Sequence, residues 1–149
     1  MKQEDINTLK NSPAARRVIL SLLMTANQLN EEVAETLKPF GLSIPQFNVL
    51  RILRGQKGKP ANLSTIQNKM VSKMSNTTRL VDKLITKGLV ERITCKKNRR
   101  KVEITITDRG LALLAEIDPV VVISEETSTD NLSASEIETL TILLEKLRK

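Results

Sequence analysis

The segment 75–87 and the two runs of residues that follow it constrain the fold more than any other part of this sequence. Within 75–87, apolar residues recur at steps of three and four, which is the period of an α-helix that buries one face. That face holds Thr77, Leu80, Val81, Leu84 and Ile85. The runs 89–94 and 102–106 are rich in Val, Ile and Thr, and the second alternates strictly between apolar and polar residues. This order predicts an amphipathic helix followed by a two-stranded hairpin.

Two further helices are predicted before this unit. Ser43 and Gln46 form a capping-box pattern that opens a helix through Phe47, and the glycines and proline of GQKGKPAN at 55–62 end it. The residues LSTIQNKM at 63–70 then form a short helix, with a turn expected near 71–73. The region 63–87 is therefore expected to be a helix pair.

The N-terminal part of the sequence predicts one long helix. Ser12 can cap its free backbone N–H groups, with Pro13 at the first helical position, and an apolar stripe continues until Pro39 and Gly41 stop it. A helix of about 25 residues is longer than a small domain needs. We therefore expect part of its stripe to pack against another copy of the chain, in preference to forming a lid within one chain.

The C-terminal part predicts two helices. Thr107 and Asp108 cap the first, and the pair Asp118-Pro119 is expected to bend or break it, so that the apolar run after Pro119 can be read as helix or strand. Ser133 and Glu136 form a second capping box that opens the last helix. The fold class predicted is mainly α with a small β-hairpin.

Composition limits what the chain can do. Of the 149 residues, 40% are hydrophobic, but Phe40 and Phe47 are the only aromatics, so an aliphatic core is expected. Without histidine and with the single cysteine Cys95, the sequence lacks the usual zinc ligands and the commonest general base, and neither an enzyme, a metal site nor a cofactor is expected. No apolar run reaches the roughly 20 residues that span a bilayer, and no signal peptide is recognisable. A cytoplasmic, nucleoid-associated protein with no membrane partner is expected.

The net charge of +7 is unevenly distributed. Residues 61–110 carry a net charge of +8, whereas residues 111–149 carry −5. Five of the six residues at 96–101 are Lys or Arg, and they lie between the two predicted strands. A local basic block of this kind is typical of a surface that binds a polyanion, although a solvated basic face would have the same composition.

A helix pair followed by a basic hairpin indicates a winged helix-turn-helix that binds double-stranded DNA. A helix fits the major groove, where amide, guanidinium and hydroxyl groups can read base edges. The candidate contacts of this recognition helix are Lys73, Ser75, Asn76, Thr77, Thr78, Arg79 and Lys83. In the hairpin, called the wing below, the candidates are Lys96, Lys97, Asn98, Arg99, Arg100 and Lys101, with an arginine entering the minor groove. The alternative is a protein-interaction module that docks on an acidic partner.

The sequence resembles the MarR family of bacterial and archaeal transcription regulators. The similarity is carried by LSTIQNKM, by TRLVDKLITKGLVER at 78–92 and by NRRKVEITITDRG at 98–110. It implies a homodimer in which the first and last helices interlock, with dimerisation segments at 1–38 and 111–149 and the DNA-binding domain at 39–110. By this resemblance, Arg100 matches the wing arginine. Asn98 departs from the pattern, because an acidic residue is common there, although Asn98 can still order the turn.

The function expected is therefore a sequence-specific regulator, a repressor, that binds a near-palindromic operator and is released by a small-molecule effector of unknown identity. The effector pocket is expected near Arg16, Arg17, Phe40 and Phe47. A redox-responsive regulator is the alternative, in which Lys96 and Lys97 lower the pKa of Cys95.

Overall fold

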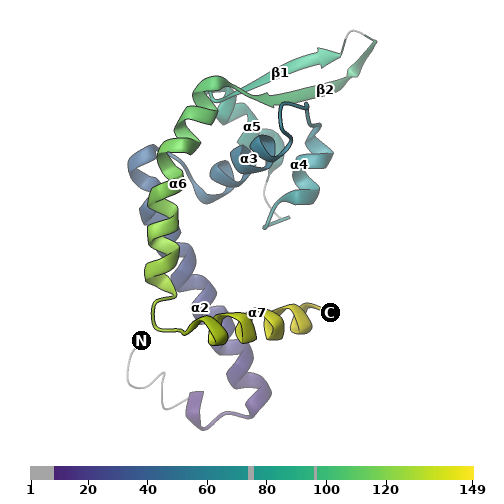
Figure 1. The fold of residues 1–149 in the computed structure, drawn as a ribbon. Coiled ribbons are helices and arrows are strands. Elements are labelled where there is room, and N and C mark those ends of the chain that lie inside the picture. The colour runs from purple at the N-terminus through teal and green to yellow at the C-terminus, as the bar shows by residue number, and fades with distance from the viewer. Residues whose placement is uncertain (1–8, 74–75, 96) are drawn as a thin grey trace.

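The computed structural model describes residues 9–73, 76–95 and 97–149. Its elements are α2 (Ala14–Leu37), η1 (Lys38–Phe40), α3 (Ile44–Gly55), α4 (Leu63–Lys69), α5 (Thr77–Thr86), β1 (Val90–Cys95), β2 (Asn98–Ile106), α6 (Asp108–Ser128) and α7 (Ala134–Arg148). In Figure 1, α3, α4, α5 and the hairpin gather at one end, which we call the head. The terminal helices α2 and α7 lie toward the other end, and α6 runs between the two regions beside α2. The predicted fold class is confirmed.

The head has a closed, almost wholly aliphatic core. Leu50 of α3, Ile66 of α4 and Leu84 of α5 are fully buried, as is Ile104 of β2. These side chains come from four different elements, so their burial fixes how the elements lie relative to one another. Phe47 joins the same core, and the residue is 4% exposed.

The wing is a twisted antiparallel pair that is continuous with the head. Val90 pairs with Ile106 at its base, and the register shifts by a bulge between Thr94 and Cys95. Ala61, in the loop before α4, extends the sheet: its N–H donates to the Ile104 carbonyl at 2.9 Å, and its carbonyl accepts from the Ile104 N–H at 2.8 Å. The base of the wing is therefore held by three segments of backbone.

The strand β2 begins earlier than the sequence predicts. It starts at Asn98, opposite Cys95, so most of the basic stretch is strand, and Asn98 is not in the turn as expected. The cause is the antiparallel pairing itself, which continues outward as long as backbone partners are present and does not need β-branched residues.

Three predicted helix caps are confirmed. Ser43 with Gln46, and Ser133 with Glu136, form reciprocal capping boxes, and the Thr107 hydroxyl accepts from the Gly110 N–H at 3.1 Å. At the N-terminus the prediction is shifted by one residue, because Pro13 is the N-cap residue of α2 and the helix begins at Ala14. Pro13 has ψ near 149°, an extended conformation, so it stands just outside the helix.

The expected break at Asp118-Pro119 is wrong, and so is the strand alternative, because α6 runs continuously to Ser128. A proline inside a helix removes one hydrogen bond and costs about 3 kcal/mol. Packing against α2 offsets this cost: Ile117 is fully buried, and Thr36 donates to the Ser124 hydroxyl at 3.2 Å. One turn further on, the Ser128 hydroxyl donates to Glu32 at 2.6 Å.

Glu32 is a charged residue in this contact between α2 and α6. The Ser128 hydroxyl, and then the Gln28 amide at 3.0 Å, donate to its carboxylate and hold the pKa of Glu32 below its usual value. The hydrogen bonds favour the ionised form of Glu32, so the contact is at full strength near neutral pH.

The terminal helices leave much of their apolar surface exposed. Ile19 and Leu23 of α2 are 54% and 63% exposed, and Leu143 of α7 is 56% exposed. Among its described residues, α7 buries none. Within the described ranges, no helix is both long enough and apolar enough to cross a membrane.

Candidate nucleic-acid interface

The helix α5 presents one buried and one exposed face. Val81 and Leu84 are fully buried against the head, whereas Thr78, Arg79 and Lys83 are exposed on the other side. Asn76 is the N-cap residue, and its side-chain oxygen accepts from the Arg79 N–H at 3.1 Å. The exposed face of α5 therefore presents a hydroxyl, a guanidinium and an ammonium group.

Two of the candidate readers are already engaged within the chain. A bidentate contact with adenine needs both the oxygen and the nitrogen of an Asn side chain, and the oxygen of Asn76 caps α5. Thr77 is 7% exposed, and its hydroxyl donates to Gln67 of α4. Thr77 therefore faces α4 and belongs to the interior of the helix pair, as its place on the apolar face of the sequence pattern indicates.

The remaining candidates are only partly described. Lys73, before α5, is exposed, as are Lys97 and Lys101 of the wing. Ser75 and Lys96 lie outside the described residues. The backbones of Cys95, Asn98, Arg99 and Arg100 belong to the two strands, but their side chains are outside what the structure describes.

An ion pair that the sequence analysis missed joins the wing to α5. The Arg92 guanidinium of β1 binds the Asp82 carboxylate of α5 at the side of the wing near its base. Both side chains are partly exposed, so the pair contributes little to overall stability, but it links the two elements that carry the candidate contacts. Position 98, where an acidic residue is common in the family that the sequence resembles, is Asn98 in this chain, and the pair of Asp82 and Arg92 links the wing to α5 near the base. Its partners are ten residues apart and meet only after the chain turns into the hairpin, so no local spacing predicts them.

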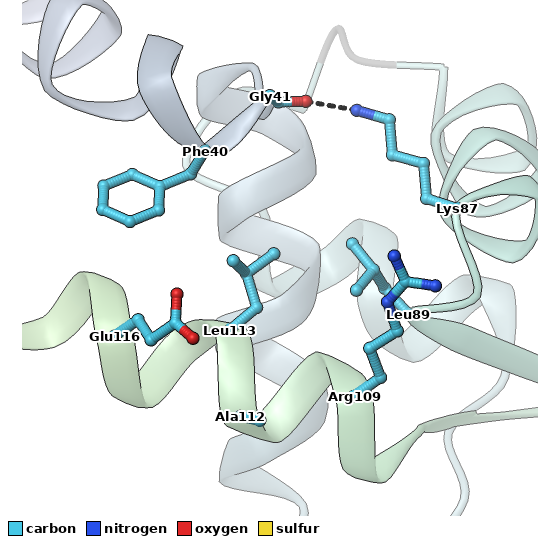
Figure 2. Close-up of a pocket in the computed structure, with 8 residues that line it drawn as sticks. All are labelled: Phe40, Gly41, Lys87, Leu89, Arg109, Ala112, Leu113 and Glu116. Carbon is cyan, nitrogen blue, oxygen red and sulfur yellow. Dashed lines mark hydrogen bonds between the residues drawn. The ribbon is translucent and has the colours of Figure 1, made fainter.

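A cavity of about 380 Å³ lies where η1, the end of α5 and the start of α6 meet. Figure 2 shows the residues around it: Phe40, Gly41, Lys87, Leu89, Arg109, Ala112, Leu113 and Glu116. The Lys87 ammonium group donates to the Gly41 carbonyl, and Gln46 lies 3.4 Å from the same nitrogen. The cavity thus combines an apolar wall with two cations and one carboxylate.

Of the four residues predicted for an effector pocket, Phe40 alone lines this cavity. Phe47 is in the core of the head, and Arg16 and Arg17 are exposed near the start of α2. The length of α2 separates the two arginines from the head. The cations at the cavity are Lys87 and Arg109, which are brought to Phe40 by tertiary packing.

Comparison with known proteins agrees with this architecture. The family model described as MarR family matches residues 42–102. The multiple antibiotic resistance protein MarR of Escherichia coli is 30% identical over 130 residues, which are 85% of this chain and 88% of that protein. A MarR transcription factor from Planctomyces limnophilus is 31% identical, with a TM-score of 0.72 over 90% of this chain and 97% of that one.

One similar structure contains DNA. A mutant of E. coli MarR complexed with operator DNA is 26% identical, with a TM-score of 0.79 over 91% of this chain and 99% of that chain. The matched residues 42–102 include α5, β1 and the first part of β2. The sequence similarity to E. coli MarR extends beyond them to most of the chain. This chain therefore belongs to the MarR family of DNA-binding transcription regulators.

Proposed function

We propose that the chain is a homodimeric repressor that reads a near-palindromic operator with α5 and the wing. The observation that carries the proposal is the exposed face of α5, where Thr78, Arg79 and Lys83 stand beside a hairpin with five cations at 96–101. The operator complex of the E. coli relative supports it, because that protein has the same fold as this chain.

In this proposal α5 enters the major groove with its N-terminal residues toward the base edges. Arg79 is suited to guanine or phosphate, Thr78 to a base edge or a thymine methyl group, and Lys83 to phosphate. The wing follows the DNA backbone, which Lys97, Lys101 and the arginines at 99 and 100 are proposed to contact. Thr77 is left out of the contact set because it is buried, and Asn76 is assigned to capping α5.

Dimerisation is proposed to use the terminal helices. The exposed apolar residues of α2 and α7 supply a surface that a second copy can cover, which supports assigning 1–38 and 111–149 to dimerisation.

The first turns of α6 pack on the head, with Gly110 so close to the Leu89 carbonyl that a Cβ atom on residue 110 would clash with it. A rigid α6 would then transmit any change in the dimer to the head.

The test is to recover DNA from the genome of the source organism with the purified protein and to sequence it. The proposal predicts an enriched inverted repeat whose half-sites lie about one helical turn apart. With about six to ten phosphate contacts, the logarithm of affinity should fall with the logarithm of salt concentration with a slope of about −0.9 per contact. No enriched motif, together with weak binding to every duplex, would favour the protein-interaction alternative.

Release by an effector is the second part of the proposal, and the cavity beside Lys87 and Arg109 favours it. Two cations above an apolar wall suit a small carboxylate with an aromatic or aliphatic body. Addition of such a carboxylate should raise the melting temperature and weaken DNA binding, and Arg109→Gln should remove both effects. A panel of carboxylates that changes neither quantity, measured on the wild-type protein, would count against an effector of this class.

A further inference from the structure

We propose that Gln67 is a positioning residue that sets the placement of the N-terminal end of α5 on DNA. The inference rests on the proposed function, because it concerns the helix that is proposed to read bases. Gln67 lies in α4 and is not one of the residues proposed above to contact DNA. Its side-chain amide bonds to Lys73, in the turn between α4 and α5, and to Thr77, the first residue of α5.

The two bonds use the two different ends of one amide group. The Gln67 nitrogen donates to the Lys73 carbonyl at 2.5 Å, and the Gln67 oxygen accepts from the Thr77 hydroxyl. A carbonyl can only accept, so the nitrogen must point toward Lys73, and the amide has one favourable orientation. Gln67 therefore couples the backbone of the turn to the first residue of α5.

Burial alone does not hold this turn. Met70 at the end of α4 is buried, but the chain then leaves the core, and Val71 is 88% exposed. Ser72 and Lys73 are exposed as well. With little apolar contact over these three residues, the hydrogen bond from Gln67 is the interaction described there that ties the turn to the helix pair.

The other parts of α5 have anchors of their own. Its C-terminal end is tied to the loop before α3 through Lys87 and Gly41, and its middle is tied to the wing through Asp82 and Arg92. The bond from Gln67 to Thr77 acts at the opposite end, next to Thr78 and Arg79. That end is the one whose placement matters most for base contacts, which tolerate displacements of only about 0.5 Å.

A positioning role makes a prediction that a purely stabilising role does not. Loss of the clamp should weaken binding to a specific duplex more than to a nonspecific one, because phosphate contacts tolerate small shifts of the helix and bidentate base contacts do not. The quantity to measure is thus the ratio of the two affinities. A general loss of folded protein, or a change in net charge, lowers both affinities together and leaves this ratio unchanged.

The experiment uses the full chain, a duplex that the wild-type protein selects from a random library, and a scrambled duplex of the same length and composition. Thr77→Val keeps the shape of the side chain and removes the hydroxyl, whereas Thr77→Ser keeps the hydroxyl. Gln67→Glu keeps the acceptor for Thr77 but faces the Lys73 carbonyl with a group that cannot donate. Thr86→Val is the matched control, because the bond described for the Thr86 hydroxyl is to the Asp82 carbonyl of its own helix.

We expect Thr77→Val and Gln67→Glu to lower the affinity ratio about tenfold, as the loss of one hydrogen bond allows. Thr77→Ser and Thr86→Val should keep the wild-type ratio within about twofold. Thermal unfolding of each variant, followed by circular dichroism, shows whether the fold is retained.

The experiment distinguishes a failure of the proposed function from a failure of the positioning role alone. If the wild-type protein selects no duplex, the proposed function and this inference are both overturned. If the wild-type protein is selective but Thr77→Val and Gln67→Glu keep its ratio, or lower both affinities equally along with the melting temperature, the positioning role alone is overturned and sequence-specific binding stands.

Discussion

The head and the terminal helices differ in how completely a single chain covers their apolar residues. In the head, side chains such as Ile66, Leu84 and Ile104 are fully buried by neighbours from the same chain. In α2 and α7, Ile19, Leu23 and Leu143 are more than half exposed. The apolar core of the head is thus buried within one chain, whereas the terminal helices expose an apolar surface that another chain could cover.

Charge separates the two regions as well. The net charge of +8 over residues 61–110 is concentrated in the head, and the net charge of −5 over residues 111–149 belongs to α6 and α7 beyond it. A polyanion is therefore attracted to the head and repelled from the C-terminal helices. One region is therefore suited to a nucleic acid and the other to a second protein chain.

The largest expected effect is on the core of the head. Leu84→Ala removes a fully buried side chain and should lower the free energy of unfolding by about 4 kcal/mol. Leu143→Ala, the matched change at an exposed position of α7, should cost far less in a dilute sample where dimers dissociate. Chemical denaturation of both variants at several protein concentrations compares them. If both variants lost the same free energy of unfolding at every protein concentration, the proposed difference between the two regions would be wrong.

The next effect concerns assembly. Ile19→Glu places a charge in the apolar stripe of α2, and an unpaired charge buried between two chains costs about 3 kcal/mol or more. The dimer should weaken more than a hundredfold, while the circular dichroism of the head is retained. Ser21→Glu is the control, because two residues further along a helix lie about 200° around its axis. Sedimentation velocity measures the outcome, and a wild-type monomer at micromolar concentration would contradict the proposed interface.

A smaller effect separates the two kinds of DNA contact within the head. Arg79→Ala should weaken binding to the selected duplex by about 2 kcal/mol and relax the preference at particular base pairs. Lys101→Ala should weaken binding to all sequences alike and reduce the salt slope by about one. Fluorescence anisotropy titrations on selected and scrambled duplexes at several salt concentrations measure both. If Arg79→Ala binds like wild type, the assignment of α5 as the reading helix is wrong.

The smallest effect is the pH dependence of the contact between α2 and α6. Because the pKa of Glu32 is lowered in the folded chain by Ser128 and Gln28, its contribution to stability is present above the usual pKa of 4.5. It is lost as the pH falls through the lowered value. The melting temperature of Glu32→Gln should therefore fall less than that of wild type between about pH 6 and about pH 3. An identical fall in both proteins would show that this hydrogen bond does not contribute.

Much of the fold follows from local patterns in the sequence. The capping boxes at Ser43 and Ser133, the cap at Thr107 and the apolar period of α5 depend on residues three or four positions apart, and the structure confirms them. The prediction at Pro119 failed for the opposite reason. The local cost of proline is offset by packing between α6 and α2, and residues that meet only after folding supply that packing.

In the candidate site too, some features follow from local sequence patterns and others depend on tertiary contacts. Exposure of Thr78, Arg79 and Lys83 follows from helical periodicity, and so does the burial of Thr77. The clamp at Gln67, the ion pair between Asp82 and Arg92 and the cavity beside Lys87 join residues from different elements. Such contacts depend on the tertiary arrangement, for which spacing along a single sequence contains no signal.

The proposed homodimer on a symmetric operator is tested most directly by the stoichiometry and symmetry of the complex between the protein and its selected DNA. We expect two chains on one duplex, protecting an inverted repeat whose half-site centres are about 10 base pairs apart. Sedimentation equilibrium on the complex gives the number of chains, and footprinting gives the repeat. A single chain bound to an unrepeated sequence, with the terminal helices still exposed, would contradict the account.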